Sequence, residues 1–145
     1  MSDNKAGPGQ AAPWYLWAVV GFAILWNGYG VILWGGTTFM ADAFLSALPA
    51  PQRDYVMGLP SWSTFTWGLG VLGGVGGSIL LAMRNRLAVP AFALSLVGAV
   101  VNTMVYITNP PPEGFFSLPL TLFIIGFAAF QLWFAYFVKA RGVLA

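Results

Sequence analysis

The chain has 145 residues, of which 59% are hydrophobic and only 7% are charged. In soluble domains about a quarter of all residues are charged. This composition therefore excludes an ordinary soluble fold and indicates a protein that is embedded in lipid. The net charge is +2, and the sequence contains neither cysteine nor histidine. We therefore expect no nucleic-acid partner, no disulfide bonds, no thiolate nucleophile and no imidazole that could bind a metal or act as a general base.

Four apolar runs predict four transmembrane helices. None of the runs contains Asp, Glu, Lys or Arg. Each has about 21 residues, which lets a helix cross roughly 30 Å of hydrocarbon. Strands are not expected, because the alternation of period two that they require is missing. The sequence therefore predicts an all-α membrane protein, an up-and-down bundle over residues 14–138 with spans at 14–35, 62–83, 87–107 and 118–138.

The charged residues predict the orientation of this bundle. Five of the six basic residues fall at the N-terminus, between the second and third spans, or at the C-terminus. In a four-span protein these three segments lie on one side of the membrane, and positive charge marks the cytoplasmic side. Both termini are therefore expected in the cytoplasm, with residues 1–13 as a flexible tail and residues 139–145 as a short second tail.

Residues 36–61 form the only sizeable segment outside the spans on the opposite side. Apolar residues recur at helical spacing within 38–48, which predicts a short amphipathic helix in the outer interface. Pro49 ends this helix, and a second helical piece follows as far as Gly58. The residues expected to form this outer cap are Met40, Phe44, Leu45 and Leu48.

The second span contains the stretch GLGVLGGVGG, residues 68–77, whose first six residues fit the dinucleotide-binding pattern G-x-G-x-x-G. A dinucleotide site needs a strand before the glycines and an acidic residue roughly twenty residues after them. Here the glycines lie inside a span, and the next acidic residue is Glu113. We therefore expect no nucleotide cofactor.

The same glycines predict close packing between two helices. Lipid provides no hydrophobic drive for helix association, so small residues that let backbones approach are favoured at the contacts. The short turn 84–86 makes the second and third spans neighbours, and Gly70, Gly74 and Ser78 are expected to form one row towards the third span. Gly68 and Gly76 point away and could face lipid, a pigment or another protein. The full expected packing surface is Thr66, Gly70, Gly73, Gly74, Gly77 and Ser78 with Ala91, Ser95 and Gly98.

Three amide side chains lie within the spans, namely Asn27, Asn102 and Gln131. An unpaired amide in hydrocarbon costs several kcal/mol, so each should have a partner, and Asn27 and Asn102 are expected to meet. These amides either bond between helices or bind a small neutral solute beside aromatic residues. The spans hold no ionisable pair for acid–base chemistry, so neither an enzyme nor a metal site is expected.

Several motifs resemble a group of short four-span bacterial membrane proteins, some of which carry a sugar-transporter label. The resembling stretches are LWNGYG, PQRDYVMGLPSW, WGLGVLGGVGGSILL and RNRLAVPAFALSLVG. The resemblance implies a multi-pass protein of the bacterial cytoplasmic (inner) membrane and assigns no binding or catalytic residue.

Two functions remain open at this point. The absence of charges within the spans and the glycine faces favour a non-catalytic accessory or assembly subunit that packs against a larger membrane complex. The alternative is a transporter of a small neutral solute, of the sugar type, acting as an oligomer. Besides the lipid bilayer, the expected partners are other membrane subunits or further copies of the chain.

Overall fold

The computed structural model describes residues 11–145, so most of the expected flexible tail 1–13 lies outside the described residues. This part of the chain forms six α-helices and no strand. Four of the helices are long and apolar enough to cross a membrane, which confirms the all-helical fold and the four candidate spans. These four are α1 (Trp14–Phe39), α4 (Ser61–Ala82), α5 (Ala88–Thr108) and α6 (Leu118–Ala140).

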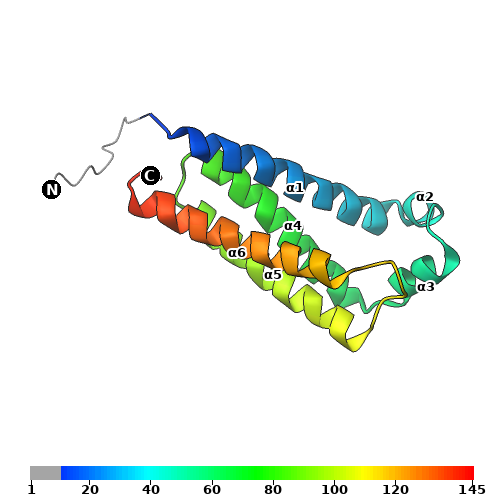
Figure 1. The fold of residues 1–145 in the computed structure, drawn as a ribbon. Coiled ribbons are helices and arrows are strands. Elements are labelled where there is room, and N and C mark those ends of the chain that lie inside the picture. Colours follow the sequence, from blue (N-terminus) through cyan, green and yellow to red (C-terminus); the bar gives the residue numbers. More distant parts are fainter. Residues whose placement is uncertain (1–10) are drawn as a thin grey trace.

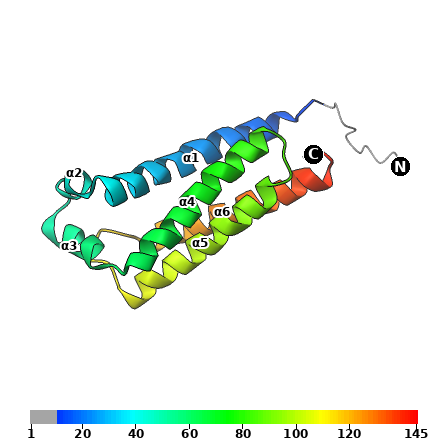
Figure 2. The ribbon, with the colours of Figure 1, turned by 180° about the vertical axis from the view of Figure 1, so that it is seen from behind.

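The four long helices lie side by side along one common direction (Figure 1). Two short helices, α2 (Ala41–Leu45) and α3 (Ala50–Gly58), lie together at one end, which we call the cap end. The C-terminus and the turn between α4 and α5 lie at the other end, which we call the terminal end. Helix α4 packs against both α1 and α5, and α5 packs against α6. Figure 2 shows the molecule from behind, with α4 and α5 side by side along their length.

Helices α4 and α5 touch through their backbones. A Cβ atom placed on Gly98 would lie 2.6 Å from the backbone nitrogen of Gly70 and 2.8 Å from the carbonyl oxygen of Thr66. A Cβ on Gly73 would lie 3.1 Å from the carbonyl oxygen of Ala91 and 3.1 Å from the nitrogen of Ser95. No side chain fits between two backbones at these distances. Glycine at 73 and 98 is therefore what allows this helix pair to form, and the backbone of Gly70 is the surface that Gly98 meets.

Helix α4 also uses glycine on a second face, against α1, and this differs from the row expected from the sequence. Gly74 lies against the side chain of Asn27, and a Cβ on Gly68 would meet the indole of Trp34 at 2.7 Å. Ser78 is fully buried, and its hydroxyl donates to the carbonyl of Gly74 on its own helix. A spacing of four residues advances about 40° around a helix at each step, so the expected row turns from α5 to α1.

The remaining glycines of this stretch divide between the two sides of α4. Gly77 accommodates the ring of Phe92 from α5, which lies 2.7 Å from the position of a Cβ. Gly76 has open space beside it and faces away from the described chain. Gly68, which the sequence left open to lipid, pigment or protein, is covered by Trp34 of the same chain.

A closely packed core fills the terminal end. It is built from α1, α4, α5 and α6 together with the last residues of the chain, and it includes Leu16, Val20, Leu81, Phe92, Phe134, Val138, Val143 and Leu144. The expected C-terminal tail 139–145 is thus largely part of the fold: α6 continues to Ala140, and the residues after it turn back into the core. The apolar side chains of Val143 and Leu144 provide the reason, because both become buried there.

Two matching helix ends hold this tail in place. Two residues after the end of α4, Arg84 has φ 57°, and two residues after the end of α6, Gly142 has φ 72°, both in the left-handed region. In each case the next residue donates its N–H back to the last turn, from Asn85 to Leu80 at 2.8 Å and from Val143 to Val138 at 3.0 Å. The two turns then pair, because the N–H of Ala145 donates to the carbonyl of Arg84 at 2.8 Å.

The segment between α1 and α4 also differs in detail from its expected form. Helix α1 runs on to Phe39 instead of ending near residue 35, and the helix expected at 38–48 is reduced to α2, a single turn. The ring of Phe44 packs directly onto Gly36. The backbone of Met40, with φ −130° and ψ 44°, is not helical, so the helix expected at 38–48 is interrupted there and the chain turns to bring this ring onto α1.

The glycine contact between α4 and α5 predicts a sharp contrast between two equal substitutions. Gly98→Ala forces the two backbones apart and should lower the free energy of unfolding by about 2 kcal/mol or more. Gly76→Ala meets no neighbour and should be neutral or should stabilise the helix by about 0.5–1 kcal/mol. Thermal unfolding in mild detergent measures both. Equal effects of the two substitutions would contradict the backbone contact.

Candidate functional site

The cap half of the bundle encloses a cavity of about 660 Å³. It is lined by all four long helices and by residues of α2 and α3. Cavities of roughly 300–1,000 Å³ are typical of sites for small organic molecules. The packed core of the terminal end lies beneath it, so the cavity is confined to one half of the bundle.

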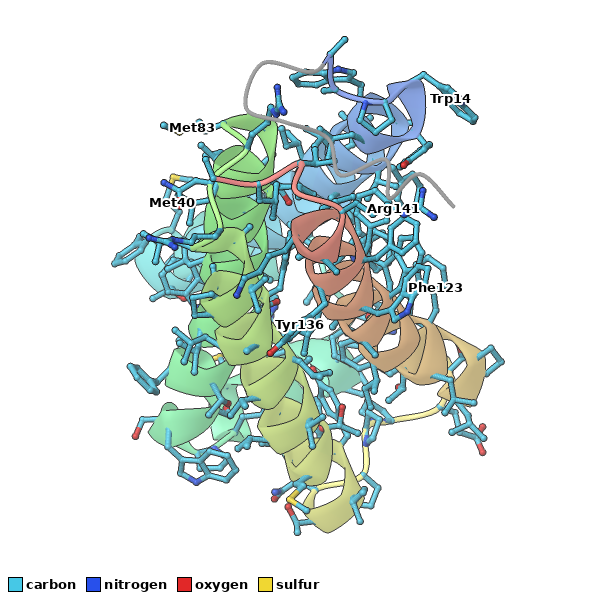
Figure 3. The ribbon with its side chains drawn as sticks, turned by 90° about the vertical axis from the view of Figure 1, so that its left-hand side faces the viewer. Trp14, Met40, Met83, Phe123, Tyr136 and Arg141 are labelled. Atoms are coloured by element: carbon cyan, nitrogen blue, oxygen red, sulfur yellow. The ribbon has the colours of Figure 1, made fainter. Side chains whose placement is uncertain are left out.

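The cavity exists because the helices approach each other unequally. Helices α4 and α5 are in backbone contact, whereas α1 and α6 meet through aromatic rings. The ring centroids of Trp26 and Phe123 are 4.8 Å apart and those of Phe22 and Phe127 are 5.1 Å apart, both edge to face. Figure 3 views the bundle from the terminal end and shows the side chains around the four helices, with Trp14 directed outward. The bundle therefore has large rings between α1 and α6 but direct backbone contact between α4 and α5, and this difference leaves space within it.

A pair of buried amides lies at the inner end of this cavity. The Nδ2 group of Asn27 on α1 donates to Oε1 of Gln131 on α6 at 2.8 Å, and also to the carbonyl oxygen of Ala23 at 2.8 Å. Gln131 is 2% exposed and Asn27 is 7% exposed. Both residues line the cavity. This hydrogen bond therefore joins the two helices that otherwise meet through rings.

Asn102 occupies a different part of the cavity wall and does not meet Asn27, contrary to the expectation from the sequence. Its Oδ1 accepts from the hydroxyl of Thr66 at 3.4 Å, and its Nδ2 donates to the hydroxyl of Tyr106 at 3.4 Å. Both distances are long for hydrogen bonds. The side chain of Asn27 lies against Gly74 of α4, where the missing Cβ leaves room for it. From there its amide reaches Gln131 on α6.

The residues expected to pack α4 on α5 also contribute to the cavity. Ser95 and Gly98 both lie at the helix contact and line the cavity, as do Thr66 and Gly70. The hydroxyl of Ser95 donates to the carbonyl oxygen of Gly70 at 2.6 Å, a hydrogen bond between the two helices. The same wall of the cavity is thus both the main packing surface and a possible binding surface.

Three of the four expected cap residues cover the cavity. Phe44, Leu45 and Leu48 line it, and Leu45 is only 7% exposed. Met40 does not line it and is 56% exposed, because the turn into α2 directs it outward. The cap thus packs on the bundle of its own chain.

Tyr55 fastens the other part of the cap. Its hydroxyl donates to the carbonyl oxygen of Asn109, at the end of α5, at 2.7 Å. Its ring lies edge to face with that of Phe115 at 5.9 Å. Burial, reinforced by the nearby Tyr106, raises the pKa of Tyr55 to about 12. A phenol is protonated at neutral pH even without this shift, and the raised pKa keeps it a donor under more alkaline conditions as well.

Sequence reasoning missed two of the aromatic residues at this site. Tyr106 lies one helical turn after Asn102, and this spacing could have identified it. Tyr55 and its partner Asn109 are far apart in the sequence, and no local pattern connects them. Trp34 was likewise missed as a cover for Gly68, and its indole N–H donates to the carbonyl oxygen of Thr64 at 2.9 Å.

The site is electrically neutral. Among the described residues that line the cavity, none is Asp, Glu, Lys or Arg. Within residues 11–145, no group of acidic residues is arranged to hold a metal ion. The walls offer apolar surface, aromatic rings, amides and hydroxyls, which can bind a ligand by contact and by neutral hydrogen bonds.

No protein-family model, curated protein or solved structure matches this chain. The function must therefore be inferred from the cavity and from the way that the fold encloses it.

The hydrogen bond from Tyr55 predicts how firmly the cap is closed. The chain has no native cysteine, so Leu45→Cys gives a single thiol on the buried side of the cap. In detergent this thiol should react slowly with a maleimide, and adding Tyr55→Phe should speed the reaction about fivefold, as expected for the loss of one hydrogen bond. Ser46→Cys, at an exposed neighbouring position, should react rapidly in both backgrounds. An unchanged rate at Leu45→Cys would show that Tyr55 does not hold the cap.

Proposed function

We propose that this protein binds one small, neutral and largely apolar molecule within the membrane, in a cavity that faces the outer side. The observation that carries the proposal is the cavity of about 660 Å³, which all four long helices enclose without contributing any charged residue. A closely packed bundle of this size would not need such a space, because empty volume forfeits packing energy.

The exposed surface supports a location in the membrane. Trp14, Leu25 and Phe65 are 79%, 74% and 71% exposed, and other large apolar side chains cover the outward sides of the same helices. Lipid is the solvent in which such a surface is stable. We place the protein in a bacterial inner membrane, in line with the resemblance found in the sequence.

The distribution of charge supports an up-and-down bundle with both termini in the cytoplasm. Arg84, Arg86, Lys139 and Arg141 all lie near the terminal end, whereas the cap end holds the acidic residues of the described chain and Arg53. By the positive-inside rule the terminal end is cytoplasmic. The cap and the cavity then belong to the outer half of the membrane.

The lining of the cavity narrows the class of ligand. A sugar presents a hydroxyl on almost every carbon and needs a partner for each of them. Here most of the lining surface is apolar, and several hydroxyls of the wall, those of Ser63, Ser95 and Thr103 among them, already donate to backbone carbonyls. This lining favours a molecule that is mostly apolar. Transport of such a molecule would require the core at the terminal end to open, so binding is the activity that the present conformation supports.

Filling the cavity tests the proposal. Ala128 on α6 is 7% exposed and lines the cavity, whereas its neighbour Ala129 is exposed. The hydrocarbon 2-isopropenylnaphthalene should bind saturably to the protein in lipid nanodiscs, beyond its partition into empty nanodiscs. Ala128→Phe should abolish this binding, and the control Ala129→Phe should retain it. Equilibrium dialysis measures the bound fraction.

Two outcomes of this experiment would contradict the proposal. One is the absence of any saturable binding to the unchanged protein. The other is an equal loss of binding in both variants while both remain folded.

An assembly role is a second candidate, and one observation favours it. Gly21, Gly28 and Gly35 follow each other along α1 at intervals of seven residues, and each has open space beside it. Small residues at this interval keep to one side of a helix and suit close contact with another transmembrane helix. We infer that, if the chain is an accessory subunit, this face of α1 meets the partner.

The assembly role predicts different results at two nearby glycines. Gly28→Leu should leave the thermal stability unchanged but should remove proteins that co-purify in mild detergent, because its side chain meets nothing within the chain. Gly30→Leu should destabilise the protein itself, since a Cβ at Gly30 already lies 2.8 Å from Cγ1 of Val71. Co-purification that persists in Gly28→Leu would contradict a contact through this face.

A further inference from the structure

The amide pair at the inner end of the cavity leaves one group unused. Gln131 accepts a hydrogen bond through Oε1, but its Nε2 group donates to no residue of the described chain. The side chain is 2% exposed, so lipid and bulk water do not reach it freely. A buried amide nitrogen without a partner is costly, and native structures seldom leave one.

The orientation of both amides follows from the backbone. The atom of Asn27 that faces the carbonyl oxygen of Ala23 at 2.8 Å must be the nitrogen, because a carbonyl only accepts. That same nitrogen lies 2.8 Å from Gln131, so the atom of Gln131 that faces it must be the oxygen. The free end of Gln131 is therefore its NH₂ group, with two N–H donors.

The NH₂ group has only the cavity to face. No fully enclosed side-chain nitrogen or oxygen in the described chain lacks a partner. The unpaired Nε2 must therefore reach open space, and Gln131 lines the cavity. The oxygen of the partner amide does not compensate, because Oδ1 of Asn27 lies against Gly74 of α4.

We infer that the inner end of the cavity is a hydrogen-bond donor site for a carbonyl oxygen. The inference rests on the proposed binding function and specifies its ligand: a neutral, largely apolar ketone, quinone, ester or amide. Its carbonyl oxygen accepts from Nε2 of Gln131, and its apolar part extends towards the cap between Trp26 and Trp67. The ligand thereby completes the hydrogen bonding of a buried amide that the protein leaves incomplete.

A carbonyl fits this end better than a hydroxyl. A hydroxyl would also bring a proton that needs an acceptor. Oε1 of Gln131 and the carbonyl of Ala23 each accept from Asn27, and Oδ1 of Asn27 lies against Gly74, so a hydroxyl would have to share one of these acceptors. A carbonyl supplies acceptors alone, which is what the free NH₂ group requires.

Two probes of the same shape test the inference. In 2-acetylnaphthalene a carbonyl oxygen replaces the CH₂ group of 2-isopropenylnaphthalene, and both molecules are uncharged. Dissociation constants in nanodiscs are compared after correction for partition into empty nanodiscs. The ketone should bind about tenfold more tightly, as expected for one additional hydrogen bond to a buried group.

The variant Gln131→Met should reduce this preference to about one, because both affinities are measured in the same variant and only the ketone uses the NH₂ group. It removes the NH₂ group at similar volume and leaves Asn27 bonded to Ala23. Gln52→Met, the same change on α3 at a residue that does not line the cavity, serves as the control and should keep the preference. A preference that survives Gln131→Met would overturn the inference.

The unchanged protein provides a second readout that does not depend on the folding of a variant. The carbonyl stretching frequency of bound 2-acetylnaphthalene should fall below its value in lipid alone, because a donated hydrogen bond weakens the C=O bond. If both probes bind equally and the frequency is unchanged, the donor site is wrong and the proposed binding function stands. If neither probe binds saturably, the proposed function itself is contradicted.

Discussion

The contact between the backbones of α4 and α5 is the constraint on which the rest of the structure depends. A Cβ at Gly98 would lie 2.6 Å from the nitrogen of Gly70, so the two helices can approach this closely only with glycine at the crossing. In lipid, where apolar surface gives no preference for helix contact, such close packing and the hydrogen bond from Ser95 to Gly70 supply the association energy. This pair then forms a rigid wall, and α1 and α6 attach to it from either side.

The unequal spacing of the helices explains both halves of the molecule. At the terminal end, residues such as Leu16, Phe92 and Val138 fill the space between the helices, and the last residues of the chain close it. In the cap half, rings hold α1 and α6 apart, and the space between them remains as the cavity. The hydrogen bond between Asn27 and Gln131 lies where the two regions meet. This hydrogen bond joins α1 to α6 at the level where the packed core ends and the cavity begins.

The sequence predicted the helical fold and the four candidate spans because span length and hydrophobicity are local properties. It also identified glycines that contact α5. It did not predict that α4 uses a second glycine face, because whether Gly74 faces α5 or α1 depends on where α1 packs. The amides were recognised as costly, yet their pairing was not, because it depends on the relative depth of α1 and α6. The C-terminal residues were taken for a tail because seven residues carry no periodic pattern from which docking could be inferred.

The proposed function requires a cavity that is accessible from the outer side and closed at the terminal end. Single cysteines at Ala128, in the cavity, and at Ala135, in the core, test it in intact cells and in inverted membranes with an impermeant methanethiosulfonate. We predict that Ala128→Cys reacts from the outer side only and is protected by 2-isopropenylnaphthalene, whereas Ala135→Cys, at a position with 0% exposure, reacts from neither side. Reaction of Ala128→Cys from the cytoplasmic side, or equal reaction at both positions, would contradict the account.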